Sequence, residues 1–307
     1  MHQHARAGMD SNACRRVDTP LVQSIIASRH GDDVPSWVLE NEDNALHDVL
    51  DRIQKKAAVG YTGKDLIDRM EQCRCLPLGY SSIDSMLHGG ILEGQVMEVF
   101  GASGSGKTQL CHMAASMTAS RGERVLYIDT NGSFSVNRIL QILGHVLGGS
   151  QCHEMLDMVT VVQCISRVDD VVACIDAYLE KNPGPSMVLV DSFGCIMSPL
   201  IGGLSYDTGH DMMFSCIMYL KRVAAEHRSA VIVTNHTVRG DTEETMADFR
   251  LKRSALGDTW PGHAHVRLQL VAQDDASSHE TYSSQRRAFL HQNTLGIPSH
   301  TCVTFTI

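Results

Sequence analysis

Val96-Met-Glu-Val-Phe100-Gly101-Ala-Ser-Gly-Ser-Gly-Lys107-Thr108-Gln-Leu-Cys-His-Met113 runs from an apolar segment through a glycine-rich turn into a helical pattern. Residues 101–108 fit the motif GxxxxGK[ST] at every defined position. Glycines in such a turn let backbone N–H groups converge on phosphate oxygen atoms, and the following helix adds a favourable dipole for an anion. The stretch therefore predicts a phosphate-binding loop in an α/β fold, in preference to a glycine-rich turn without a ligand.

The motif gives each polar side chain a role. Lys107 is expected to reach the outer phosphates and to act in catalysis, and the Thr108 hydroxyl is expected to ligate Mg²⁺. The residues expected to contact the nucleotide here are Gly101, Ala102, Ser103, Gly104, Ser105, Gly106, Lys107, Thr108 and Gln109.

Strand and helix patterns alternate on both sides of this loop. The predicted strands are Val96–Phe100, Val125–Asp129, Met158–Gln163, Met187–Asp191 and Ala230–Asn235. The predicted helices are Lys107–Ser120, Ser135–Val146, Val168–Lys181 and His210–His227. Helical crossovers of this length imply a mostly parallel sheet flanked by helices. Three further segments predict closing strands in an antiparallel C-terminal extension: His265–Val271, Arg286–His291 and Cys302–Ile307.

Polar residues stand at the ends of three predicted strands, at Asp129, Asp191 and Asn235. Ligands of open parallel sheets bind at the carboxyl ends of the strands, so these residues point to one shared site. A hydrophobic strand that ends in a carboxylate, Met187–Asp191, is typical of a Walker B segment in which Asp191 holds magnesium. A helix cap is the alternative for Asp191, and Asp129 is either a strand-end cap or an indirect contributor to the magnesium site.

The composition limits the class of protein. The chain has 307 residues, 43% of them hydrophobic, and a formal net charge of -9, which fits a globular protein and does not by itself suggest a nucleic-acid binder. Ten scattered cysteines indicate reduced thiols. We expect no membrane association, because no apolar run approaches the ~20 residues of a membrane span. We expect no secretory signal, because Met1 to Arg16 has no apolar h-region. Residues 1–75, with a short helix over Lys64–Cys73, predict a small helical N-terminal region and linker before a core over residues 76–307.

Several segments follow the order of a known family. They are Leu78-Gly79, Ile83-Asp84, Gly89-Gly90-Ile91, Gly106-Lys107-Thr108-Gln109-Leu110-Cys111-His112, Val125-Leu-Tyr-Ile-Asp129-Thr130, Val190-Asp191-Ser192 and Val233-Thr234-Asn235. With them the core resembles the RecA-type strand-exchange ATPases in their eukaryotic recombinase branch. Within that branch it is most similar to the D-type, or delta, paralogue, on the segments Asp129-Thr-Asn131-Gly132, Ser198-Pro-Leu-Ile-Gly202-Gly203, Thr234-Asn235-His236 and Ala255-Leu-Gly257 with Trp260.

The resemblance implies a RecA-like P-loop core that binds ATP and Mg²⁺, contacts single-stranded DNA and works in homologous-recombination repair of DNA damage in the nucleus. The D-type paralogue belongs to a hetero-oligomer of recombinase paralogues that assists the main recombinase, with its N-terminal region against one partner and its core against another. The resemblance also places Arg138 where recombinases stack an arginine on adenine. A solvated helix arginine is the alternative.

The sequence departs from the active recombinases at the catalytic positions. Asn131 stands where hydrolytic members place the glutamate that activates water, and His236, after Asn235, stands where they have a γ-phosphate-sensing glutamine. Loss of a general base typically costs ~10²–10⁴ in rate, so we expect weak hydrolysis at most. An ordinary turn residue is the alternative for Asn131. The linker also lacks a convincing Phe-x-x-Ala polymerisation segment, so a long homofilament is not expected.

The resemblance places two loops against single-stranded DNA. The first, Met197–Gly209, contains no lysine or arginine, and the second, Val238–Ala255, balances its positive and negative charges. Binding of DNA by the isolated chain is therefore expected to be weak and salt-sensitive. The candidate DNA-binding residues are Arg239, Arg250, Lys252 and Arg253, with a solvated flexible loop as the alternative. Tyr206 and Trp260 stack on bases or, by the favoured interpretation, pack beneath the loop.

Three functions fit these features. The favoured one is an ATP-binding accessory factor of recombination repair within a hetero-oligomer. The second is an autonomous DNA-dependent ATPase with strand-exchange activity, which requires DNA-stimulated hydrolysis at ordinary rates. The third, an unrelated P-loop kinase or NTPase, requires a lid with catalytic arginines, and the order of the segments after the P-loop fits it less well.

Overall fold

The computed structural model describes residues 62–149, 151–163, 167–201, 206–238, 253–257, 260–272, 284–294, 296–299 and 301–307. The chain divides into two compact units, Met1–Ile67 and Asp68–Ile307. The expected N-terminal helical region lies outside the described residues, apart from its last helix, which is α3 (Gly63–Glu71).

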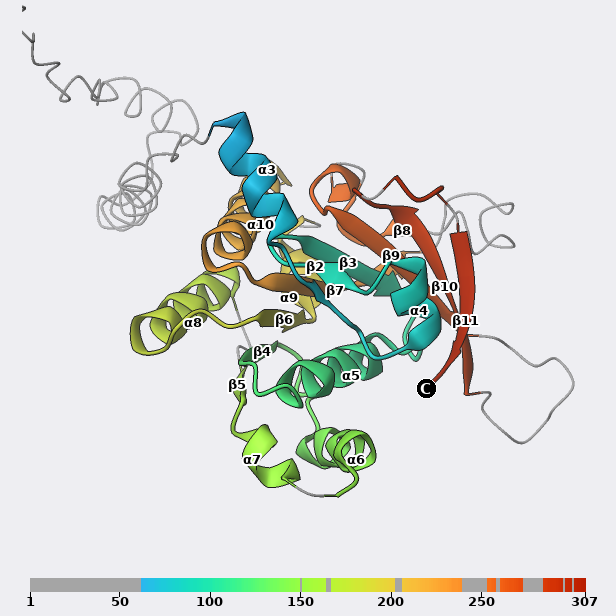
Figure 1. Ribbon diagram of the computed structural model, residues 1–307. Coiled ribbons are helices and arrows are strands. Elements are labelled where there is room, and N and C mark those ends of the chain that lie inside the picture. Colours follow the sequence, from blue (N-terminus) through green and yellow to red (C-terminus); the bar gives the residue numbers. More distant parts are fainter. Residues whose placement is uncertain are drawn as a thin grey trace, which may run out of the picture. The chain divides into compact units, whose positions relative to one another are not determined.

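The central sheet of the second unit has the strand order β11-β10-β9-β3-β7-β6-β4-β5, with β8 paired to β7 beside this path (Figure 1). Its strands are β3 (Val96–Gly101), β4 (Val125–Asp129), β5 (Val159–Gln163), β6 (Met187–Asp191), β7 (Ala230–Val238), β8 (Arg253–Ser254), β9 (Val266–Ala272), β10 (Gln285–Gln292) and β11 (Thr301–Thr306). Strands β3 to β7 are mutually parallel, as the βαβ alternation predicts. The P-loop strand β3 lies between β7 and β9, well inside the sheet.

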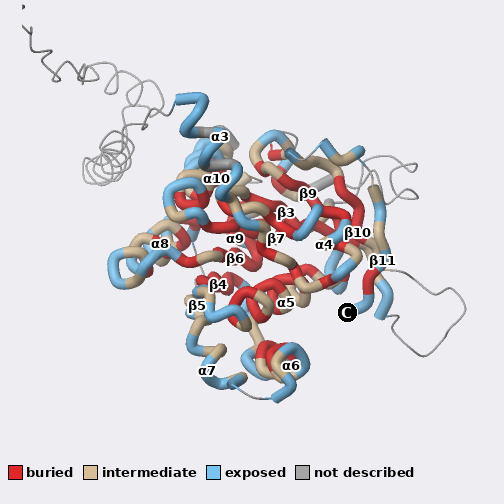
Figure 2. The backbone as a smooth tube through the Cα atoms, in the orientation of Figure 1, coloured by how far each residue is buried: buried red, intermediate tan, exposed pale blue. Residues whose placement is uncertain are grey.

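Helices cover both faces of the sheet. They are α4 (Ser81–Met86), α5 (Lys107–Ala119), α6 (Val136–Leu147), α7 (Cys152–Leu156), α8 (Val168–Lys181), α9 (Phe193–Ile201) and α10 (Tyr206–His227). One core packs α4, α5 and α6 against one face, and a second packs α8, α9 and α10 against the other. The central strands are buried along most of their length between these layers (Figure 2). This burial explains why the strands are continuously apolar rather than alternating.

The lead-in to the P-loop is a small hairpin. Strands β1 (Cys75–Leu76) and β2 (Ile91–Leu92) pair antiparallel around α4, and Tyr80 packs edge-on against Phe305 of β11 at 4.9 Å. Within the described ranges, no helix combines the length and the apolar character that crossing a bilayer requires.

Two details differ from the sequence-based expectations. The first closing strand, β9, is parallel to β3, and only β10 and β11 form the antiparallel extension. Much of the expected loop Met197–Gly209 is helical, because α9 continues to Ile201 and α10 begins at Tyr206. The apolar side chains of Phe193, Ile196 and Met197 bury one face of α9, which explains why this segment is a helix.

Candidate nucleotide-binding site

The glycine-rich turn joins β3 to α5 as the motif predicts. Gly106 takes the position before the helix with φ 102°, a conformation that glycine adopts without strain. A Cβ on Gly106 would approach Ile307 Cδ1 to 2.4 Å, and one on Gly101 would approach the Leu270 carbonyl oxygen to 2.3 Å. Gly106 is therefore required by its backbone conformation, and Gly101 by the close approach of the Leu270 backbone.

Lys107 lies at the centre of this turn. Its Nζ donates hydrogen bonds to the carbonyl oxygens of Gly101 at 2.9 Å and Ala102 at 2.8 Å. Burial lowers the pKa of Lys107, and the negative charge of Asp191 opposes that shift. Ser105 Oγ is buried and has no hydrogen-bond partner among the described residues. Residues 102–104 of the turn are exposed. The Lys107 ammonium group and the Ser105 hydroxyl donor beside them fit a phosphate ligand.

The expected magnesium ligands meet across the sheet. Thr108 Oγ1 donates to Asp191 Oδ2 at 2.7 Å, although 83 positions separate the two residues. Asp191 also accepts hydrogen bonds from Tyr127, at 2.9 Å, and from Ser133 and Thr234. Burial, and then the nearby acidic groups, raise the pKa of Tyr127, so its hydroxyl remains a donor at neutral pH. This set of oxygen atoms fits a hard cation such as Mg²⁺.

A tight turn follows β4, and the Asp129 side chain caps its backbone N–H groups. Asp129 Oδ1 accepts from the backbone N–H of Ser133 at 3.0 Å, and Oδ2 accepts from that of Phe134 at 3.2 Å. Asn131 is exposed, and its Oδ1 accepts from the Ser133 N–H at 3.1 Å. Of the two roles considered for Asp129, the contacts support the strand-end cap. Asn131 forms an Asx turn, and its amide cannot accept a proton from water.

Sequence analysis missed a buried ion pair beneath the loop. Glu98 of β3 is fully buried and accepts from Arg267 Nε at 2.6 Å and from Asn235 Nδ2 at 2.9 Å. The Arg267 guanidinium also lies over the Phe100 ring at 4.9 Å. The sequence did contain a signal for this pair, because Glu98 is a charged residue inside an apolar strand. A buried charge needs a partner. The network links β9, β3 and β7, and it fixes Asn235 opposite Phe100. Asn235 was expected to end its strand, but β7 continues to Val238.

His236 lies beside the P-loop, because β7 is registered against β3 with His236 opposite Gly101. Its Nε2 is 3.2 Å from Cys195 Sγ of α9. Burial, and then the positive charge of Lys107, lower the pKa of His236, so the imidazole is neutral at pH 7.

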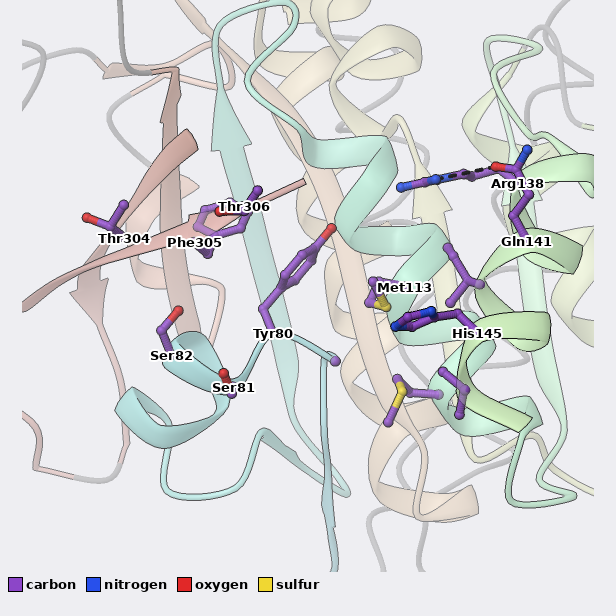
Figure 3. Close-up of a pocket in the computed structure, with 14 residues that line it drawn as sticks. Tyr80, Ser81, Ser82, Met113, Arg138, Gln141, His145, Thr304, Phe305 and Thr306 are labelled. Carbon is purple, nitrogen blue, oxygen red and sulfur yellow. Dashed lines mark hydrogen bonds between the residues drawn. The ribbon is translucent and has the colours of Figure 1, made fainter. Parts of the chain in front are cut away.

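Arg138 occupies a defined position rather than extending freely into solvent. Its Nε donates to Gln109 Oε1 at 2.8 Å, and its Nη1 donates to Gln141 Oε1 at 3.4 Å. Arg138 lines a cavity of about 720 Å³. Figure 3 shows the α6 side chains on one side of this cavity and the β11 residues on the other, with Tyr80 between them. Gln109 lies in the first turn of α5, so its hydrogen bond holds Arg138 near the start of that helix. The cavity itself is lined from α5 by Met113 and Met117, and by none of the residues 101–109.

The candidate DNA-binding residues are largely outside the described part of the chain. Arg239, Arg250 and Lys252 fall in the undescribed segment 239–252, and Arg253 is placed only as the first residue of β8, paired with Val238. Trp260 is buried and stacks on Phe193 at 5.3 Å, so the packing interpretation of this residue is confirmed.

Comparisons with known proteins show the family to which the chain is related. A family model described as Rad51 matches residues 69–276. The DNA repair protein RAD51 homolog 4 of Bos taurus is 30% identical over 244 residues, covering 76% of this chain and 72% of the relative. The protein of the same name in Mus musculus is 31% identical over 256 residues, covering 80% of this chain and 74% of the relative.

An archaeal protein and a solved structure extend the comparison. The DNA repair and recombination protein RadB of Thermoplasma volcanium is 29% identical over 171 residues, covering 55% of this chain and 68% of the relative. The crystal structure of the RadB recombinase superposes with a TM-score of 0.60 at 23% identity, covering 76% of this chain and 96% of that chain. At this identity the superposition shows a shared RecA-like fold.

Proposed function

The chain belongs to the Rad51 family, and from that premise we propose that it binds ATP with Mg²⁺ between the P-loop and the end of β6. The observation that carries the proposal is the contact of Thr108 with Asp191, because it joins the two segments that must share the metal. The orphaned Ser105 hydroxyl and the central Lys107 ammonium support it from the phosphate side.

Each side chain has a distinct task in this site. Lys107 exchanges its carbonyl partners for the outer phosphate oxygens, and Thr108 and Asp191 hold the metal. Bound Mg²⁺ supplies charge neutralisation at the phosphates. Tyr127 and Thr234 orient the Asp191 carboxylate through their hydroxyl groups. Arg138, held by Gln109, offers its guanidinium plane to the adenine base.

Hydrolysis is proposed to be weak because the described site lacks a free carboxylate at the position of the family's catalytic glutamate. The described carboxylates near the strand ends are all engaged: Asp129 caps a turn, Asp191 receives hydroxyl donors, and Glu98 is paired with Arg267. Asn131 can orient a water molecule and cannot accept its proton. His236 is a hydrogen-bonding residue at the position of the phosphate sensor, beside Asn235.

We further propose an accessory role in homologous-recombination DNA repair, in the nucleus, as one member of a hetero-oligomer of recombinase paralogues. The relatives named RAD51 homolog 4, a D-type paralogue, support this assignment, and the RadB relatives support recombination repair more broadly. Residues 1–75 are proposed to contact one partner and the core another. Single-stranded DNA is proposed to bind weakly to the isolated chain, through Arg239, Arg250, Lys252 and Arg253.

Substitution of Lys107 tests the nucleotide site. We expect Lys107→Ala to abolish ATP binding in isothermal titration calorimetry with Mg²⁺ present, because no other described cation lies within the turn. Lys181→Ala, at the exposed end of α8, is the matched control and is expected to bind ATP as the native chain does. Native affinity in Lys107→Ala contradicts the proposal.

A further inference from the structure

Cys195 and His236 form a thiol–imidazole pair that the proposed function leaves unused. Cys195 is exposed in the first turn of α9, and its Sγ is 3.2 Å from His236 Nε2. This distance lies within hydrogen-bonding reach for a nucleophile and its base. Most of the other free cysteines in the described ranges are buried or half-buried, and Cys302 is the other exposed one.

The packing of α9 fixes the position of this thiol. A Cβ on Gly194 would approach Asn235 Oδ1 to 2.3 Å, so the start of α9 packs directly against β7. The backbone of Cys195 is therefore held close to His236 by this packing. The Cys195 side chain lies four positions after Asp191, on the segment that leaves the proposed metal ligand.

The pair also faces the phosphate loop. His236 is registered opposite Gly101, and the positive charge of Lys107 acts on the imidazole. A negative charge on Cys195 would act in turn on Lys107. The thiol thus contacts the residue that is paired with Gly101, where the phosphate loop begins.

We propose that Cys195 is a site of covalent modification by hydroperoxides, with His236 accepting the thiol proton, and that this modification and nucleotide binding exclude each other. An exposed thiol with an adjacent base and a nearby cation is the environment in which thiolates form most readily. His236 Nε2 is within hydrogen-bonding distance of Cys195 Sγ, and a neutral imidazole has one ring nitrogen free to accept the thiol proton.

The reaction is balanced with the peroxide as oxidant. The S–H bond breaks, and the proton passes from Sγ to His236 Nε2. The sulfur lone pair then forms an S–O bond with one peroxide oxygen, and the O–O bond breaks. The departing hydroxide takes the proton from the imidazolium and leaves as water. Sulfur is oxidised by two electrons to a sulfenic acid, and the peroxide is reduced.

Site-resolved labelling tests the pair. The full-length chain, without nucleotide, is treated with hydrogen peroxide and dimedone, and labelled peptides are quantified by mass spectrometry. Cys302 is the internal control, because it is exposed on β11. We expect Cys195 to be labelled at least ~10-fold faster than Cys302, and His236→Gln, which keeps a hydrogen-bonding side chain without a titratable base, to remove most of this advantage. Equal rates for the two thiols, or an unchanged advantage in His236→Gln, overturn the assignment.

A second experiment tests whether modification of Cys195 and nucleotide binding exclude each other. This part of the inference rests on the proposed nucleotide site. A non-hydrolysable ATP analogue with Mg²⁺ is expected to slow labelling of Cys195 and leave Cys302 unaffected, while Cys195→Ser binds the analogue with native affinity. Calorimetry on the same sample separates the outcomes. Binding without protection overturns the exclusion. Absence of binding overturns the proposed function and leaves the first experiment to decide the thiol–imidazole pair.

Discussion

Glu98 illustrates how a single residue holds the site together. It is fully buried and paired with Arg267, and its second oxygen accepts a hydrogen bond from Asn235 of β7. The ion pair lies on adjacent parallel strands, where β3 and β9 place Glu98 opposite Arg267. Removal of one member of a buried pair leaves an uncompensated charge, which costs more than the pair itself contributes.

Arg267→Met is therefore expected to lower the free energy of unfolding by about 3–5 kcal/mol, measured by urea denaturation. The double variant Glu98→Gln/Arg267→Met removes the stranded charge and keeps an acceptor for Asn235. We expect it to be more stable than Arg267→Met alone. If Arg267→Met is at least as stable as the double variant, Arg267 is not needed to compensate the buried charge of Glu98.

At the scale of single residues, the sequence predicted those that belong to a known motif. It did not predict the residues that only the packing of the strands brings together. Lys107, Thr108 and Asp191 have a fixed spacing or a strand-end position, and the structure places all three at one site. Glu98 and Arg267 are 169 positions apart, so their pairing depends on strand order that no local pattern encodes.

At the scale of an element, the junction of β3, the glycine-rich turn and α5 depends on its glycines. Its glycines are required for the left-handed conformation and for contacts with distant segments, as at Gly106. Gly144, in contrast, lies inside α6 with nothing within 4 Å of a Cβ built there. The two glycines predict opposite effects of the same substitution.

Gly106→Ala is expected to be destabilised and to lose ATP binding, because the new Cβ strains the backbone and displaces Ile307. Gly144→Ala is expected to raise the free energy of unfolding by about 0.5–1 kcal/mol with ATP binding unchanged, since alanine favours the helix interior. Thermal denaturation and calorimetry on both variants measure these effects. Native affinity in Gly106→Ala would contradict the account of the loop.

Helices and strands were predictable wherever their apolar period is strong. The bounds of β4, β6 and α8 agree with the predicted ranges. The second half of α9 falls in Met197–Gly209, which the family resemblance places as a loop, although the buried apolar residues there favour a helix. The alternation of apolar and polar residues in β9 did not predict the direction of the strand. A strand that follows the parallel set can pair with it in a parallel or an antiparallel direction.

Across the whole molecule, burial lowers the pKa of four described histidines below the ordinary value: His112, His236, His263 and His265. Two of them accept hydrogen bonds from backbone N–H groups while neutral: His265 Nδ1 from Val96 at 2.9 Å, and His112 Nε2 from Ser135 at 3.2 Å. The unfolded chain therefore binds more protons than the folded one below about pH 6.5, so stability falls as the pH falls.

We expect the free energy of unfolding to be lower at about pH 5.5 than at about pH 7.5, measured by urea denaturation. His265→Asn keeps an acceptor for the Val96 N–H and removes one titrating group. Its stability is expected to change less between the two pH values. Stability that rises on acidification in this range would contradict the assigned burial of these histidines.

The central claim is that this Rad51-family chain holds ATP at a site that has lost its general base. ATP turnover by the purified chain, with and without single-stranded DNA, tests it most directly, with Lys107→Ala and Asn131→Glu measured alongside. We expect negligible turnover that DNA barely stimulates, and a rise of ~10² or more in Asn131→Glu as a carboxylate base is restored. Robust DNA-stimulated turnover by the native chain, abolished in Lys107→Ala, would contradict the claim and establish an autonomous ATPase.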